Sequence, residues 1–233
     1  FYAGAKYSDK CLMGSSYGAK KARDCFEMAR ILFEEEEIID DRAVLITIIN
    51  TNSPLQFDSR MLGSLIEHAK CNQATVITPC AMAGSTGPMS LAGTLTLQNV
   101  EALTGIVLTQ LINPGAPVVY GCASTITDME TASVSIGSVE YAKLVGACAQ
   151  LARYYGLPCR AGGSLTDSLM PDAQAGYESM MSFKSTLNHG VNFVLHSAGL
   201  LENYMTMSYE KFIIDDEIIS RVTNYQSGIG VNE

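Results

Sequence analysis

The chain has 233 residues, of which 47% are hydrophobic and 17% are charged, so intrinsic disorder is excluded and a large buried core is expected. The formal net charge is −9 without any basic cluster, which argues against a nucleic-acid partner and against anionic membrane surfaces. The longest apolar stretches, such as Ala43 to Ile49, are far shorter than the roughly 18 residues that a membrane span needs. We therefore expect a protein without nucleic-acid or membrane partners.

The seven cysteines indicate a reducing compartment. Their number is odd and no Cys-x-x-Cys pair occurs, whereas a disulfide framework favours an even count in a smaller chain. We expect reduced, mostly buried thiols in a cytoplasmic protein.

The chain repeats one pattern, in which a short β-branched run is followed by a polar or glycine-rich loop and a longer amphipathic segment. A helix over Ser16 to Ile39 comes first, and its acidic end at Glu34 to Glu37 opposes the helix dipole, so fraying is expected there. The first strand is predicted at Ala43 to Ile49. Its helix follows over Asp58 to Lys70, with Asp58 or Ser59 as the N-cap.

Four further strand and helix pairs follow in chain order. The strands are expected at 75–78, 117–120, 157–160 and 192–196, and their helices at 90–112, 139–155, 172–187 and 208–225. The spacing matches βα units of at least about 30 residues, and the apolar strands indicate a parallel sheet covered by helices. No linker or change in composition divides the chain, so we predict a single domain over residues 1–233.

Repeated βα units allow an open doubly wound sheet or a (β/α)8 barrel. The open sheet is disfavoured because Asn50 to Pro54 replaces the expected G-x-G-x-x-G after the first strand, and no Walker-type motif occurs. We therefore predict an α/β fold of the (β/α)8 TIM-barrel type. Five strands are too few for eight and the chain has no initiator methionine, so an incomplete barrel from a longer chain is expected, although strands hidden near the ends, such as Phe1 to Ala5, are the alternative.

In such a barrel, functional side chains lie at the carboxyl ends of the strands and in the loops that follow them. The candidate substrate-binding residues are Asn50, Tyr120, Arg160, Asp167, His196, Glu202 and Tyr204. Arg160 is expected to bind a substrate carboxylate, or alternatively to form an ion pair with Asp167 or Asp172. His196 ends an apolar strand and is expected to face the barrel mouth, the alternative being a structural histidine. Two of the tyrosines, Tyr120 and Tyr204, suit a cationic ligand through their rings, and equally suit ordinary packing.

Two catalytic mechanisms are disfavoured by the inventory of side chains. A Schiff-base aldolase needs a lysine at a strand end, and none of the eight lysines follows a predicted strand. A zinc site would use Cys80, Cys122, Cys159 and His196, but strand alternation points only one of Cys159 and Arg160 inward. The remaining histidines, His68 and His189, are expected at the surface.

Several separate motifs extend from the first helix to Glu233. They are Pro88 to Thr94, Gln110 to Gly121, Leu157 to Arg160, Thr166 to Ser168, Pro171 to Gly176, His196 to Gly199 and Ser208 to Phe212. Together they resemble the trimethylamine/glycine betaine corrinoid methyltransferase family. The resemblance implies a (β/α)8 barrel that moves a methyl group from a methylated amine to the Co(I) centre of a separate corrinoid protein.

The trimethylamine branch of that family carries pyrrolysine, which would fall near Gly163 to Pro171, where this chain has only standard residues such as Leu169 and Met170. The resemblance therefore implies the non-pyrrolysine branch and a quaternary amine such as glycine betaine. A quaternary ammonium carries a good neutral leaving group, so the protein mainly has to position the methyl group, and no catalytic side chain is predicted. Arg160, with His196 as a second donor, would hold the carboxylate, and π faces or acidic groups such as Asp167 or Glu202 would face the ammonium.

The full prediction is a cytoplasmic homo-oligomer that binds no cofactor or metal directly and receives its corrinoid (cobalamin) on a partner protein. Two alternatives stay open, a zinc-dependent barrel methyltransferase and a non-catalytic barrel that only binds a methylated amine.

Overall fold

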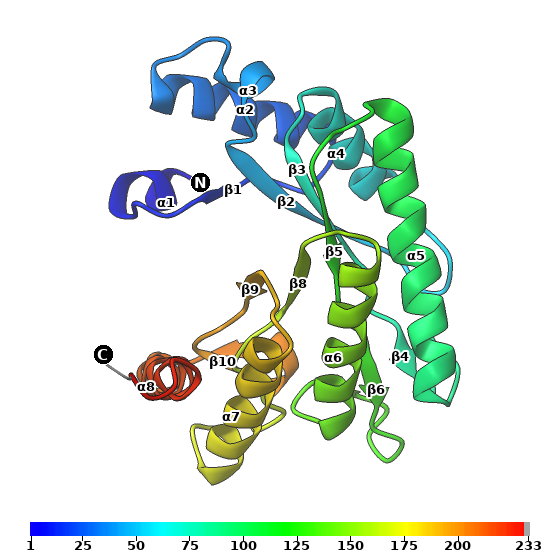
Figure 1. Ribbon diagram of the computed structural model, residues 1–233, viewed down its shortest axis with the longest axis vertical. Helices are drawn as coiled ribbons and strands as arrows, with labels where there is room; N and C mark the ends of the chain where they lie inside the picture. Colours follow the sequence, from blue (N-terminus) through cyan, green and yellow to red (C-terminus); the bar gives the residue numbers. More distant parts are fainter. Residues whose placement is uncertain (231–233) are drawn as a thin grey trace. The chain divides into compact units, whose positions relative to one another are not determined.

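The computed structural model describes residues 1–230 and divides into two compact units (Figure 1). Unit 1 comprises Phe1–Cys80 and Asn99–Gly121, and unit 2 comprises Ala81–Gln98 and the residues from Cys122 onward. Both units are built from parallel strands and covering helices, which establishes a mixed α/β architecture. Neither unit closes a barrel by itself within residues 1–230, so the complete (β/α)8 barrel and the single domain stay predictions.

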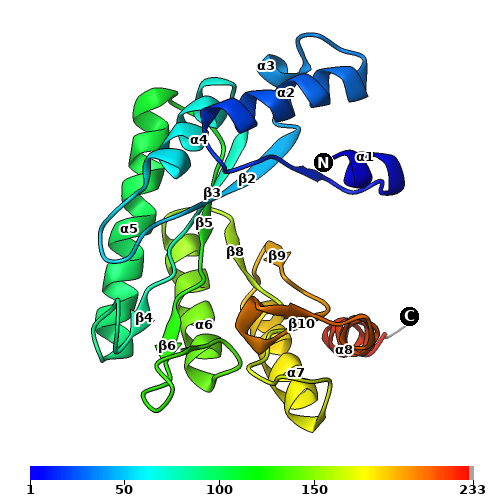
Figure 2. The same ribbon diagram turned by 180° about the vertical axis from the view of Figure 1, so that it is seen from behind.

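Unit 1 contains a parallel sheet in the order β1-β2-β3-β5. Its strands are β1 (Leu12–Met13), β2 (Leu45–Asn50), β3 (Ala74–Thr78) and β5 (Val118–Gly121), and its helices are α1 (Tyr2–Tyr7), α2 (Ala19–Phe33), α3 (Ile38–Asp41) and α4 (Ser59–Lys70). The register pairs Asn50 with Thr78 and Ile77 with Tyr120, which aligns the carboxyl ends of three strands. Figure 2 shows α2 and α4 side by side, with α4 packed on β2 and β3.

Unit 2 contains the parallel pair β8 (Cys159–Gly162) and β9 (Phe193–Leu195). Two small sheets accompany it, one of β4 (Met82–Ala83), β6 (Thr125–Thr127) and β7 (Val134–Ser135), the other of β10 (Leu200–Leu201) and β11 (Thr206–Met207) with the 3-10 helix η1 (Glu202–Tyr204) between them. The helices α6 (Val139–Tyr154), α7 (Ala173–Asn188) and α8 (Tyr209–Gln226) pack in sequence, and α6 and α7 cover β8.

The long helix α5 (Leu91–Ile112) contributes residues to both units. Gly105 faces β3 so closely that a Cβ there would lie 2.6 Å from Ile77 Cγ2, which explains a glycine within the helix. Among the described residues, α5 is the one helix that is long and apolar enough to span a membrane, judged by length and composition alone. The sequence expectation was incomplete because it considered only the lengths of apolar stretches. Polar residues spaced along α5 interrupt its apolar stretches, yet the mean hydropathy of the helix stays high enough for a membrane span. The buried side chains of α5 include Thr94, Gln98 and Glu101, a pattern also found in core helices.

All five predicted strand and helix pairs are present. The N-terminal helix is shorter than predicted, because Glu34 adopts φ 54° and ends α2 after Phe33, before the acidic run. The prediction of a strand at 157–160 was two residues early, because Pro158 has no N–H and the ladder begins at Cys159. Phe1 to Ala5 is not a strand, and the additional strand lies at Leu12–Met13.

Candidate functional site

Arg160 is the centre of the candidate site and lies within β8, only 2% exposed. Its Nη1 donates to the Cys122 carbonyl at 3.2 Å, and the Cys122 N–H donates back to the Arg160 carbonyl at 2.9 Å. Its Nη2 lies 3.0 Å from His196 Nδ1. The buried Nε has no hydrogen-bond partner among the described residues. The guanidinium is therefore held in place by these contacts, while its Nε–H still lacks an acceptor within the described chain.

No carboxylate forms an ion pair with Arg160 within residues 1–230. The two aspartates considered as ion-pair partners are used elsewhere. The carboxylate of Asp167 accepts the N–H groups of Ile136 and Gly137 at 2.7 and 2.8 Å, and Asp172 caps α7 by accepting from Ala175 N at 2.9 Å. A buried guanidinium without a counter-charge is costly, so this one is suited to an anionic ligand.

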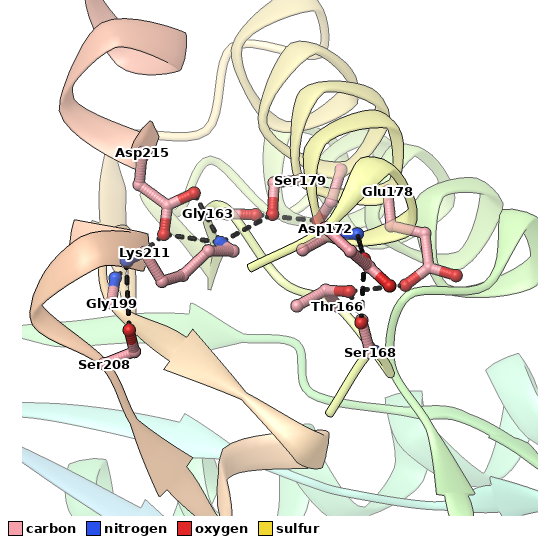
Figure 3. Close-up of polar contacts among 12 residues, drawn as sticks. Gly163, Thr166, Ser168, Asp172, Glu178, Ser179, Gly199, Ser208, Lys211 and Asp215 are labelled. Carbon is pink, nitrogen blue, oxygen red and sulfur yellow. Dashed lines mark hydrogen bonds and ion pairs between the residues drawn. The ribbon is translucent and has the colours of Figure 1, made fainter. Parts of the chain in front are cut away.

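The loop that follows β8 is held by carboxylates rather than left free. Glu178 on α7 accepts from Thr166 Oγ1 at 2.7 Å and from Asp167 N at 2.8 Å, and Ser168 Oγ donates to Asp172 at 2.9 Å (Figure 3). The Ala175 N–H and then Ser168 lower the pKa of Asp172. Asp167 therefore takes part in ordering the loop, and its predicted role toward an ammonium group stays a prediction.

His196 follows β9 and presents Nδ1 to Arg160. Burial and then the Arg160 charge lower its pKa to about 4, so the ring is neutral at pH 7. Because Arg160 has only donors, Nδ1 must accept and the proton is assigned to Nε2. His196 thus offers an Nε2–H donor next to a cation, and its role as a second carboxylate donor stays a prediction.

The titration of His196 tests this arrangement. In the folded protein its imidazole signals in NMR are expected to titrate with a midpoint near 4 instead of 6.5. Since the folded state then binds fewer protons than the unfolded state, the contribution of His196 makes folding less favourable as the pH falls from about 6.5 to 4. His196→Asn assigns the signal and removes this pH dependence. A midpoint near 6.5 would contradict the contact with Arg160.

Tyr204 lies against His196, with ring centroids 5.0 Å apart and the planes at 61°. It belongs to η1, in which Glu202, Asn203 and Tyr204 have φ values of 50°, 54° and 75°. Three consecutive left-handed residues other than glycine are unfavourable, and His196 shares this conformation with φ 59°. The strain is offset by contacts that fix the turn, including Glu202 N to the Ser168 carbonyl at 2.9 Å.

The other predicted residues divide between the two units. Glu202 is exposed and accepts from Thr206 Oγ1 at 2.8 Å. In unit 1, Asn50 is exposed at the end of β2, whereas Tyr120 is fully buried and donates to Asn99 Oδ1 at 3.0 Å. The complete burial of Tyr120 fits the packing alternative. Unit 2 brings together Arg160, His196 and Tyr204.

Tyr141 on α6 was not predicted and belongs to the same neighbourhood. Its hydroxyl accepts the Gly162 N–H at 2.9 Å. Burial, followed by the nearby Tyr204, raises its pKa well above the usual value, so the phenol stays protonated at neutral pH. Nothing in the helical pattern distinguished Tyr141 from an ordinary core tyrosine.

The cysteine and histidine expectations are only partly met. Four cysteines are buried, and all seven are free thiols. Burial raises the pKa of Cys159 to about 12. In the described part of the chain, no three His, Cys, Asp or Glu side chains are arranged to hold a metal ion. The surface position expected for His68 was wrong, because this ring is fully buried on α4 and meets Phe26 edge-on at 5.0 Å.

Comparison with known proteins identifies the family. The sequence profile of the trimethylamine methyltransferase (MTTB) family matches residues 1–233. The chain belongs to this family. Among its relatives are a glycine betaine methyltransferase of Desulfitobacterium hafniense, 53% identical over the whole chain, and a proline betaine:corrinoid methyltransferase of Eubacterium limosum, 39% identical over 98% of it.

A trimethylamine methyltransferase of Methanosarcina thermophila is 36% identical over 85% of the chain and 41% of its own length. The chain spans 48% of the length of each of the two betaine enzymes. Membership of the MTTB family confirms the resemblance that the motifs predicted.

Proposed function

We propose that the protein containing this chain transfers a methyl group from a carboxylated quaternary amine, such as glycine betaine, to the Co(I) of a separate corrinoid protein. The observation that carries this proposal is the buried Arg160, which has no carboxylate partner among residues 1–230 and whose Nε finds no acceptor there. The printed names of the two betaine relatives support the same substrate class.

The substrate carboxylate is bound by Arg160 and His196 in this proposal. Arg160 uses one donor on Cys122 and one on His196, which leaves Nε–H and further N–H groups in a planar fork that fits a carboxylate. His196 adds its Nε2–H. A trimethylamine molecule has no group to neutralise this site, which favours a betaine.

The trimethylammonium group faces Tyr204. A tyrosine ring within about 6 Å of a cation contributes roughly 0.5–2 kcal/mol, depending on desolvation. Tyr204 is half-buried and braced by His196, so its ring is oriented before the substrate arrives. Glu202, exposed and bonded to Thr206, contributes at most a long-range attraction.

Methyl transfer needs positioning rather than proton transfer, because a neutral tertiary amine leaves. The corrinoid supplies the nucleophilic metal centre when its protein docks. At pH 7 the site holds a permanent cation at Arg160, a neutral His196 and a protonated Tyr141, so none of these groups has to titrate during the reaction. The residues of this chain therefore bind the carboxylate and aim the methyl group.

Three further parts of the proposal follow from the family. The two units contribute to a (β/α)8 barrel in the complete protein, the corrinoid is carried by a partner protein, and the enzyme is a cytoplasmic homo-oligomer. Measurement of the molecular mass of the purified protein in solution tests whether it is a homo-oligomer.

The activity is tested by incubating the full-length protein with cob(I)alamin, or with a corrinoid protein, and glycine betaine. We expect methylcobalamin by absorbance and dimethylglycine in equal amounts, with little product from trimethylamine. Binding of betaine without any methylation would support the non-catalytic alternative and contradict the proposal. Activity that requires stoichiometric zinc would support the metal-dependent alternative.

A further inference from the structure

A buried ion pair lies in unit 2 beside the candidate site but outside it. Lys211 and Asp215, one turn apart on α8, are both fully buried. The Lys211 ammonium donates to the two carboxylate oxygens of Asp215 at 2.5 and 2.6 Å and to Ser179 Oγ on α7 at 2.8 Å (Figure 3). The pair therefore links α8 to α7.

The same carboxylate also holds the loop after β9. Asp215 Oδ2 accepts the Gly199 N–H at 2.8 Å. Gly199 has φ +82°, and a Cβ there would lie 3.3 Å from Phe212, so a side chain at this position would be both strained and crowded against α8. The Gly199 carbonyl accepts from Ser208 N at 2.9 Å, and Ser208 caps α8.

Gly199 and Ser208 are the two ends of the hairpin that carries Tyr204. Within it, β10 and β11 pair Leu200 with Met207, and η1 places Tyr204 at the turn. His196 lies three residues before Gly199. One carboxylate thus anchors the base of a segment whose two aromatic side chains contact each other.

Stability alone does not account for this pair. Burial raises the pKa of Asp215 and lowers that of Lys211, which reflects the cost of removing both charges from water. Replacing a buried ion pair by apolar side chains is often neutral or stabilising. Another ion pair with the same spacing on α8, Arg221 with Glu217, is exposed to solvent.

We propose that Lys211 and Asp215 are positioning residues that hold the His196–Tyr204 segment in its binding geometry through the Gly199 N–H. The inference rests on the proposed function, because the segment matters only if it binds substrate. In this inference the two residues affect substrate affinity by holding the segment, and not by binding the substrate themselves.

The test compares two double variants of the full-length protein. Lys211→Met with Asp215→Leu removes both charges and the acceptor for Gly199. Lys211→Met with Asp215→Asn also removes the charges but keeps a carbonyl acceptor for Gly199, and its amide can donate to Ser179 Oγ. The control is Arg221→Met with Glu217→Leu, which removes the exposed pair.

We expect the Leu variant to keep a Tm close to that of the wild type and to raise the KM for glycine betaine about tenfold, the effect of losing one well-placed hydrogen bond. The Asn variant and the control are expected to stay within about threefold, and kcat at saturating betaine should change less than KM. Equal KM values in the Leu and Asn variants, or KM values that merely follow Tm, would overturn the inference.

Hydrogen exchange of the unaltered protein keeps the inference testable if the Leu variant does not fold. In the unliganded protein the Gly199 amide, which donates to Asp215, is expected to exchange at least about tenfold more slowly than an exposed backbone amide, and unprotected exchange would overturn the positioning role. A wild-type protein that neither binds nor demethylates betaine would refute the proposed function instead, which separates the two failures.

Discussion

Arg160→Met is expected to weaken binding of glycine betaine about 100-fold, while a purely cationic amine such as tetramethylammonium changes less than threefold. Methionine keeps much of the volume of the buried side chain, so the loss isolates the guanidinium. A charge-assisted hydrogen bond contributes about 1.5–3 kcal/mol, and a 100-fold loss corresponds to about 2.8 kcal/mol. Calorimetric titration of both ligands measures the difference.

Two variants control for charge and for folding. Arg160→Lys keeps the charge without the planar fork and should recover only part of the affinity. Arg153→Met removes an exposed arginine of α6 and should bind both ligands like the wild type. Equal losses for the carboxylated and the purely cationic ligand would contradict the assignment of the carboxylate to Arg160.

Glu101→Ala is expected to lower the free energy of unfolding by about 3 kcal/mol. Glu101 on α5 is 1% exposed and accepts from Ser53 Oγ at 2.8 Å, from Leu55 N at 2.8 Å and from Thr51 Oγ1. Alanine would leave these donors without an acceptor. Thr51 is buried and Ser53 is half-buried, and an unsatisfied buried group costs about 1–3 kcal/mol. Urea unfolding followed by circular dichroism provides the measurement.

Glu101→Gln is the matched control, because it keeps the shape and one acceptor oxygen while removing the charge. Its cost should lie near 1 kcal/mol, in line with weaker neutral hydrogen bonds. If alanine and glutamine have the same effect, the loop at Thr51 to Leu55 does not depend on this carboxylate.

Local chemistry was enough to predict most of the regular elements. Asp58, Asp172 and Ser208 were readable as helix starts, and each accepts backbone N–H groups in the first turn of its helix. The parallel strands were recognisable because strands buried on both faces have near-continuous apolar runs. Short strands such as β4 and β7 were missed, since two residues carry no detectable period.

The candidate site was only partly predictable for a different reason. Arg160 and His196 were predicted because they end the apolar segments that the sequence pattern assigned to strands, where polar side chains are uncommon. Tyr141, Glu178 and Lys211 act through partners distant in sequence, and a lysine within a helix normally indicates a solvated surface. Only the folded chain reveals that Lys211 is buried against Ser179.

The left-handed run through Glu202, Asn203 and Tyr204 restricts how this part of the chain can diverge. Glycine, asparagine and aspartate accept that backbone readily, whereas valine, isoleucine and threonine resist it. An exchange to glycine would relieve roughly 1 kcal/mol of local strain but widen the range of orientations open to the tyrosine ring. Changes in substrate preference are therefore more accessible through the side chain at position 204 than through the length or backbone of the turn that presents it.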